Sequence, residues 1–340
     1  MTSIVMAAHA TMARPGSGMA RYARMNGDAL PRLTRPLTLL CCLLFPTASL
    51  PDASAQWDGF GYVGLMTDPA LDEVSGLAVS RAHSGTLWVE NDSGNPAAIY
   101  AVRTGGALQA TLKIEGAPNI DWEDIAAFDE DGHHYLLLSD TGDNGGIRKT
   151  LALYAIEEPV VLRNATVRPV WSIHFRWPDG PRDCEALTVD VHRGEILLVT
   201  KKRVPPQLFR LPLHPATAGL QTAELIGTVA GIPRPTAEEL EDSPGYGRYL
   251  AQITAADIST DGRLLALMDY RRVYLYRRNG DEVSADKSWA ETLARMPQQL
   301  SFGWLPQAEA MGFTLAGDAL YISGEHLPAP IVRIPVLATP

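Results

Sequence analysis

The sequence predicts an all-β protein, a β-propeller of five four-stranded blades. Three observations favour this fold: one short motif occurs five times, a turn follows each copy, and further apolar strands follow each turn. Four hairpin-linked strands per repeat are typical of a propeller blade. The copies of the motif are Glu73-Val-Ser-Gly-Leu77, Asp121-Trp-Glu-Asp-Ile125, Asp183-Cys-Glu-Ala-Leu187, Thr254-Ala-Ala-Asp-Ile258 and Gln307-Ala-Glu-Ala-Met311.

The strands of each repeat follow in order. Each motif opens a first strand in which small and aliphatic residues alternate, as expected for strands that pack between blades. Second strands are predicted at 86–89, 135–138, 195–199, 264–267 and 319–322. Third strands repeat a combination of aliphatic and aromatic residues and are predicted at 99–102, 153–156, 208–211, 273–276 and 331–334. Fourth strands are weaker and are predicted at 108–114, 167–175, 223–230 and between 290 and 296.

The ring is predicted to close through its N-terminal strand. The last repeat ends after its third strand, whereas the apolar segment 61–66 precedes the first repeat and belongs to none. Pairing this segment with the last repeat completes the fifth blade and hides two strand edges. Six blades is the alternative, because the irregular stretches 232–252 and 279–287 leave room for further strands.

Residues 1–55 are predicted to be a signal peptide and leader, and residues 56–340 a single propeller domain. Two arginines precede the apolar run 37–45, and Ala53-Ser-Ala55 has the small-residue pattern of a cleavage site. The run is too short to span a membrane. We therefore expect an exported protein, periplasmic or extracellular, without a membrane span.

The composition limits the classes of partner. The chain carries a net charge of −10. Removing the five arginines and two aspartates of residues 1–55 leaves 24 basic and 37 acidic residues, a net charge of −13. This charge argues against nucleic acid or anionic lipid as a partner. Cys184 is the single cysteine after residue 55, so neither an internal disulfide nor a cysteine-rich zinc site is expected. A monomer is expected, with a small anionic substrate or a protein or glycan ligand.

Carboxylates are expected to crowd the mouth of the central channel. Equivalent ends of the innermost strands meet on one face of a propeller, and the exits of the second strands reach the same face. Two carboxylates about 6 Å apart repel by roughly 3 kcal/mol at an effective dielectric constant near 20. Three ways to offset this repulsion stay open. A divalent cation could bind, with Ca²⁺ favoured for its oxygen ligands, or a raised pKa could keep some carboxyls protonated. The third is a set of ion pairs with Lys201, Lys202, Arg271, Arg272 and His326. The candidate cation ligands are Asp92, Asp121, Asp124, Asp140, Asp183, Asp257 and Glu309.

Six short motifs carry a resemblance to known proteins: Ser75-Gly-Leu-Ala78, Asn91-Asp-Ser-Gly94, Asp121-Trp-Glu-Asp-Ile-Ala126, Gly142-Asp-Asn144, Asp183-Cys-Glu-Ala-Leu187 and Val199-Thr-Lys201. Over nearly all of its length after residue 55, the chain resembles exported bacterial β-propellers that are loosely related to phytase-like and gluconolactonase-like propellers. A phytase-like protein would imply Ca²⁺ bridging acidic residues and a phosphate ester. A lactonase-like protein would imply one metal ion in the channel that activates water.

The resemblance also implies roles for individual residues. Lys201 and Arg271 would bind an anionic group, and Thr254 and Ala256 depart from the pattern because they replace acids in the fourth repeat. The implied metal ligands or acid–base residues are Glu123, Asp124, Asp140, Asp183, Glu185 and Asp257.

Two functions remain open. As an enzyme, the protein would be a metal-dependent hydrolase of phosphate esters or lactones, in which Glu123 or Glu185 deprotonates water and Lys201 or Arg271 holds the anion. As a non-catalytic module, the same face would bind a protein or glycan, since the fold does not choose between the roles. The sequence contains no G-x-S-x-G elbow, Walker loop or H-E-x-x-H motif.

Overall fold

The predicted five-bladed β-propeller is confirmed by the computed structural model, which describes residues 61–285, 287–303 and 305–336. The strands of each blade pair in antiparallel order from the channel outward. Blade 1 contains β2 (Val74–Val79), β3 (Thr86–Asn91), β4 (Ala98–Arg103) and β5 (Leu108–Ile114). Blade 2 contains β6 (Trp122–Glu130), β7 (His133–Asp140), β8 (Leu151–Glu157) and β10 (Trp171–Arg176). Blade 3 contains β11 (Cys184–Asp190), β12 (Glu195–Thr200), β13 (Gln207–Pro212) and β15 (Glu224–Thr228).

The last two blades follow the same plan. Blade 4 contains β16 (Ile253–Ile258), β17 (Leu264–Asp269), β18 (Arg272–Arg277) and β19 (Gln298–Ser301). Blade 5 contains β20 (Ala308–Phe313), β21 (Ala319–Gly324), β22 (Ala329–Pro335) and, as its outermost strand, β1 (Gly61–Met66). Short 3-10 helices are η1 (Pro69–Leu71), η2 (Val191–Arg193) and η3 (Gly247–Tyr249).

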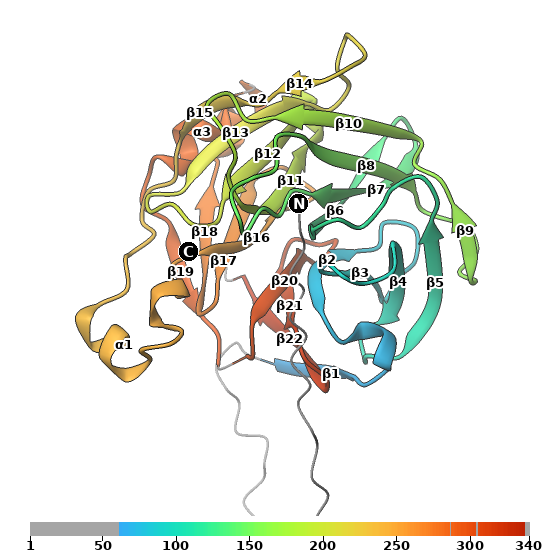
Figure 1. Cartoon of the computed structure of the whole chain (residues 1–340), viewed down its shortest axis with the longest axis horizontal. Coiled ribbons are helices and arrows are strands. Elements are labelled where there is room, and N and C mark those ends of the chain that lie inside the picture. The colour runs from blue at the N-terminus through green and yellow to red at the C-terminus, as the bar shows by residue number, and fades with distance from the viewer. Residues whose placement is uncertain (1–60, 286, 304, 337–340) are drawn as a thin grey trace, which may run out of the picture. The chain divides into compact units, whose positions relative to one another are not determined.

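The innermost strands surround the axis of the propeller (Figure 1). Strands β2, β6, β11, β16 and β20 contact one another in this order, and β20 returns to β2. The buried apolar side chains form five clusters, one at each interface between neighbouring blades. In the cluster between blades 1 and 2, for example, Trp88 of β3 shares the core with Ile125 of β6. A single blade cannot bury its apolar faces alone, so stability depends on the closed ring.

Strand β1 closes the ring as predicted. It pairs antiparallel with β22, from Gly61 opposite Arg333 to Met66 opposite Ala329. It also contacts blade 1, where the Leu65 amide donates to the Gly105 carbonyl at 3.3 Å. Closure therefore joins the two ends of the described chain within blade 5, and the contact of β1 with Gly105 connects this blade to blade 1.

We expect Gly106→Ala to weaken this closure. Gly106 has a φ of +97°, and a Cβ atom there would overlap the backbone of Leu65 in β1. Left-handed backbone costs about 1–2 kcal/mol for a residue with a side chain, and overpacking adds about 1 kcal/mol or more. The free energy of unfolding, measured by urea titration, should fall by about 2–3 kcal/mol. Gly116→Ala is the control, because Gly116 has a φ of +88° but open space around it. Equal losses for the two variants would show that the contact with β1 does not matter.

Blade 4 differs from the prediction. Its fourth strand is β19 rather than a segment between 290 and 296, where α3 (Trp289–Leu293) lies instead. The Ser288 side chain accepts a hydrogen bond from the Ala290 amide and so caps this helix. The stretches that suggested a sixth blade contain α1 (Ala237–Asp242), η3 and α2 (Gly280–Ser284). Capping boxes at Thr236 and Asn279 start α1 and α2, so helical turns form where extra strands were the alternative.

Two short strands were not predicted. Strand β9 (Ala165–Val167) pairs in parallel with β5 of blade 1, and β14 (Gln221–Thr222) pairs in parallel with β10 of blade 2. Each comes from the following blade and covers an outer edge of the preceding one, which protects that edge from intermolecular pairing. The predicted signal peptide lies outside the described residues. Among the described residues, no helix has the length and apolar composition needed to cross a membrane.

Candidate metal centre

A β-bulge interrupts the pairing of the two innermost strands in every blade, at the same end of the channel. In blade 2, for example, Glu123 is the extra residue between two paired positions of β6 and β7. Bulges re-aim a side chain near the end of a strand ladder. Three acids and two hydroxyl residues occupy this equivalent position around the channel mouth: Ser75, Glu123, Glu185, Thr254 and Glu309.

The bulges correct the alignment of the fourth repeat. The sequence comparison places Thr254 opposite Asp121 and Asp257 opposite Asp124, through a shared Asp-Ile pair. The strand pairing instead places Thr254 at the position of Glu123, two residues away from the predicted register. A shift of two residues keeps each side chain on its face of the strand but moves it along the channel, so Asp257 is the counterpart of Ala126 and not of Asp124.

Five carboxylates gather at the mouth of the channel in two overlapping triads. One oxygen from each of Asp92, Asp121 and Glu123 lies within 4.8 Å of the others, and we call this set the blade 1–2 triad. The same limit joins Glu123, Asp183 and Glu185, the blade 2–3 triad. The sequence predicted that all five would meet at this end of the channel. Glu123 belongs to both triads and is therefore the centre of the site.

The blade 2–3 triad is neutralised by lysines. Lys201 forms an ion pair with Glu185, and its Nζ atom lies 3.9 Å from the Glu309 carboxylate. Lys202 Nζ lies 2.9 Å from Asp183 Oδ2. The ion-pair compensation predicted for Lys201 and Lys202 is therefore present on this half of the site.

The blade 1–2 triad has no such compensation. No described residue forms an ion pair with Asp92, Asp121 or Glu123, and no described residue donates a hydrogen bond to the Glu123 carboxylate, which is 3% exposed. Burial, and after it the neighbouring carboxylates of Glu185 and Asp92, raises the pKa of Glu123 well above its ordinary value. Burial also raises the pKa of Asp92 and of Asp121. When these carboxyls are ionised, this half of the site thus holds negative charge that no ion pair with a described residue balances, and the raised pKa values favour the protonated carboxyls unless a cation binds.

Glu90 is a site residue that sequence analysis missed. It lies in β3, is 0% exposed, and neither carboxylate oxygen has a hydrogen-bond partner of normal geometry. Burial raises its pKa well above the ordinary value, Asp92 adds to this, and the Gly76 amide offsets part of it. A Cβ atom at Gly76 would lie 2.7 Å from Glu90 Oε1, so the side chain fits only beside a glycine. The feature of the sequence that could have identified Glu90 was a charged residue inside a largely apolar strand.

Gly142 shapes the site from the loop after β7. A Cβ atom at this position would overlap Glu123 Oε1 and lie 2.5 Å from Asp121 Oδ2. The Gly142 amide donates to the Asp121 carbonyl at 3.1 Å, which fixes the loop against the triad. The absence of a side chain at residue 142 therefore lets the carboxylates of Glu123 and Asp121 lie against the loop backbone.

Two predicted ligands, Asp124 and Asp257, lie inside the channel but in neither triad. Asp124 Oδ2 accepts hydrogen bonds from the amides of Leu187 in blade 3 at 2.8 Å and Ala256 in blade 4 at 3.4 Å. Asp257 Oδ2 accepts one from the Phe313 amide in blade 5 at 2.7 Å. Burial raises the pKa of Asp257 to about 6. Both carboxylates connect the backbones of neighbouring blades.

The other predicted site residues lie at the rim. Asp140 forms an ion pair with Arg148 at 2.8 Å. Arg271 forms an ion pair with Glu239 of α1 and makes no described contact with the triads. Glu309 accepts a hydrogen bond from the hydroxyl of Tyr270 at 2.6 Å. Tyr270, which the sequence analysis did not single out, thereby joins the Lys201 side of the site.

In the presence of EDTA, the protein should lose stability as the pH rises. Burial, and after it the Glu309 carboxylate, raises the pKa of Glu325 from 4.5 to about 9. The folded protein then binds more protons than the unfolded chain across this window, so stability is full below about pH 4.5 and declines toward pH 9. Thermal melts in EDTA at pH 5.5, 7 and 8.5 should show a falling midpoint, and Glu325→Gln should flatten the trend. A rising midpoint would mean that the acids at the mouth are already balanced.

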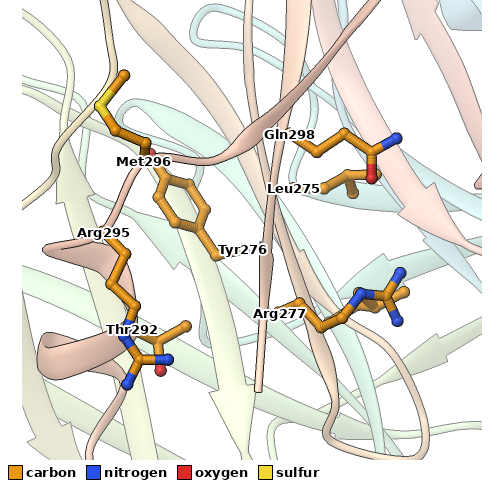
Figure 2. A pocket seen from close by; sticks show the side chains of 8 residues that line it. Leu275, Tyr276, Arg277, Thr292, Arg295, Met296 and Gln298 are labelled. Carbon is orange, nitrogen blue, oxygen red and sulfur yellow. The ribbon is translucent and has the colours of Figure 1, made fainter. Parts of the chain in front are cut away.

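A separate cavity of about 210 Å³ lies on blade 4, between the α3 segment and the outer strands (Figure 2). Tyr276, Arg277, Arg295 and Met296 contribute to its walls, and none of its lining residues belongs to either triad. The cavity is therefore not part of the candidate metal centre.

Comparison with known proteins leaves the chain without a family. No protein family matches it, and no curated protein matches it. Similar solved structures include the RRP9 WD40 repeats (13% identity, TM-score 0.37, 78% of this chain and 67% of that chain), U3-55K (14%, 0.36, 77% and 68%) and a luciferin-regenerating enzyme (12%, 0.40, 79% and 80%). None of these matches bears on the finer resemblance to phytase-like or gluconolactonase-like propellers, which stays a prediction.

Proposed function

We propose that the protein is a Ca²⁺-dependent hydrolase of phosphate esters or lactones, with the cation held by Asp92, Asp121 and Glu123. The observation that carries the proposal is the buried Glu123 carboxylate, which no described residue neutralises and which lies against Gly142 beside the Asp121 carboxylate. Three carboxylates within 4.8 Å of one another repel strongly unless a cation lies among them. Carboxylate oxygens are the ligands that Ca²⁺ prefers, so the residues present fit this ion.

The neighbouring half of the site supplies groups suited to hydrolysis. A bound Ca²⁺ would polarise a phosphoryl or acyl oxygen of the substrate. Glu185 is the general base that accepts a proton from the attacking water, because burial raises its pKa and Lys201 holds its carboxylate in place. As water adds and the ester bond breaks, the Lys201 ammonium stabilises the negative charge that develops on the substrate. Tyr270 fixes Glu309, which in turn faces Lys201.

Differential scanning fluorimetry and activity assays together test this proposal. At a Ca²⁺ concentration about 100 times the Kd, binding adds about 2.7 kcal/mol to stability, which corresponds to a rise in Tm of about 5–10 °C. Glu185→Gln should keep this rise but lower hydrolysis of p-nitrophenyl phosphate or of a simple lactone by about 10²–10⁴-fold. The absence of any Ca²⁺-dependent rise would overturn the metal site. A rise without hydrolysis of either substrate class would favour the non-catalytic binding module.

Gly142→Ala should remove the Ca²⁺ response while leaving the fold intact. The added methyl group would push the Glu123 and Asp121 carboxylates out of the positions in which they would hold the cation, and these side-chain ends can move without disturbing the backbone. Gly145→Ala in the same loop is the matched control, since its Cβ would meet only the Ile147 side chain at 3.7 Å or beyond. The Tm rise on Ca²⁺ addition should fall to near zero in the first variant and persist in the second. A full rise in Gly142→Ala would exclude the blade 1–2 triad as the site.

A further inference from the structure

A second cavity adjoins the metal centre between blades 2 and 3. Its volume is about 260 Å³, and its walls come from the loops after β7 and β12 and from the segment before β11. Asp183 belongs both to these walls and to the blade 2–3 triad, so the cavity begins where the triad ends. The charged residues of the walls are Asp143, Arg182, Asp183, Lys202 and Arg203.

The two acids of this cavity are already satisfied. Asp143 accepts hydrogen bonds from the amides of Ile147 at 2.8 Å and Arg148 at 3.0 Å. Asp183 accepts one from the Asp143 amide at 2.7 Å and forms the ion pair with Lys202. The positive charges of the walls are therefore only partly compensated from within the cavity.

Of the two arginines, Arg203 retains unused capacity to bind an anion. Arg203 is exposed and forms no ion pair or hydrogen bond with any described residue. Arg182 is 5% exposed, stacks over the rings of Trp177 and Phe209 at 5.5 and 4.7 Å, forms an ion pair with Asp179 and donates a hydrogen bond to Gln207, so only its Nε atom has no partner. The planar guanidinium of Arg203 is well suited to oxyanions, which an arginine binds through paired N–H donors.

A third cavity extends the positive surface outward. It has a volume of about 310 Å³ and shares Pro181 with the second cavity. Arg148, Lys149 and Arg176 line it, and no acidic residue does. In a chain with 39 acidic and 29 basic residues, this local excess of cations departs from the overall charge. Such a surface raises the local concentration of anions next to the metal centre.

We propose that the cavity at Arg203 binds an oxyanion of the substrate, a phosphate or a carboxylate, that is separate from the group being hydrolysed. The substrate class is then an ester or lactone that carries a second anionic group, oriented by Arg203 and Lys202 while the reacting group faces Glu123. The placement of this anion relative to the chemistry rests on the proposed function. Its binding does not, because no residue of the blade 1–2 triad lines the cavity.

Isothermal titration calorimetry in EDTA tests the anion site without the cation. We expect inorganic phosphate or succinate to bind at millimolar concentration, and Arg203→Ala to weaken binding by about 10–100-fold, the loss of one charge-assisted contact. Arg163→Ala removes the same charge from an exposed position outside the cavity and should leave binding unchanged. Binding of phosphate alone would identify a phosphorylated substrate, and binding of succinate alone a carboxylated one.

Two outcomes would overturn the anion site. One is the absence of binding by both anions, and the other is an equal loss in Arg203→Ala and Arg163→Ala, which would indicate a general field effect. Should Arg203→Ala fail to fold, Arg203→Lys keeps the charge but loses the paired donors and should bind more weakly than the wild type. Because the titration contains EDTA, its failure is independent of the Ca²⁺ experiment, and each proposal can fall while the other stands.

Discussion

Glu123→Gln is expected to stabilise the calcium-free protein and, at the same time, to abolish its stabilisation by Ca²⁺. The carboxylate is buried, lacks a hydrogen bond from any described residue and faces Glu185 and Asp92. Glutamine has nearly the same volume, so the substitution removes a charge without leaving a cavity. Relief of an unsatisfied buried group is worth about 1–3 kcal/mol. Loss of the ligand shared by both triads should remove the stabilisation of about 2.7 kcal/mol expected at 100 times the Kd.

Urea unfolding measures both effects of the substitution, the gain in stability without Ca²⁺ and the loss of stabilisation by Ca²⁺. One titration is made in EDTA and one in excess Ca²⁺. Because the pKa of Glu123 is raised, the carboxyl becomes protonated as the pH falls, and the gain in EDTA should be smaller at pH 5.5 than at pH 8.5. Glu241→Gln, at an exposed position of α1, is the control and should change neither value. A variant that is less stable in EDTA, or that keeps the wild-type response to Ca²⁺, would mean that Glu123 has a balancing partner.

The channel mouth was predictable because a repeat brings equivalent residues together. Once five copies of a motif were placed on innermost strands, Asp121, Glu123, Asp183 and Glu185 had to meet near one end of the channel. The closing strand followed from the same count, since a fifth blade lacked its fourth strand and one strand had no blade. These inferences needed only periodicity and topology, which the order of residues along the chain carries directly.

The balance of charge at the mouth was not predictable, because it depends on single atoms. Glu123 and Asp124 are neighbours in the same motif, yet one carboxylate lacks a described donor and the other accepts three amide hydrogen bonds from three blades. The register of the fourth repeat failed for a related reason. The predicted alignment followed the Asp-Ile pair that the second and fourth motifs share. The position of the bulge gives a different alignment, and strand pairing sets that position without a sign in the local sequence. Arg271 was expected at the site, but α1 supplies Glu239 to pair with it instead.

Asp124→Asn should give the largest loss of stability in the molecule, about 3–5 kcal/mol, with or without Ca²⁺. Asp124 is 0% exposed, and its two oxygens together accept the amides of Ile125, Leu187 and Ala256, which belong to blades 2, 3 and 4. Asparagine replaces one oxygen with an NH₂ group, so at least one buried amide faces another donor. An unsatisfied buried donor costs about 1–3 kcal/mol, and breaking a buried charged network costs more.

Asp129→Asn is the control for this substitution, because it makes the same chemical change in the same strand, β6, at an exposed position. We expect it to cost less than about 1 kcal/mol, the usual value of a surface ion pair. Urea unfolding measures both variants, and fluorimetry with Ca²⁺ separates the two roles that Asp124 has been given. A stable Asp124→Asn protein that no longer responds to Ca²⁺ would restore Asp124 as a metal ligand. A destabilised protein whose remaining folded fraction still gains several degrees from Ca²⁺ would show that Asp124 joins the blades and leaves the cation to Glu123.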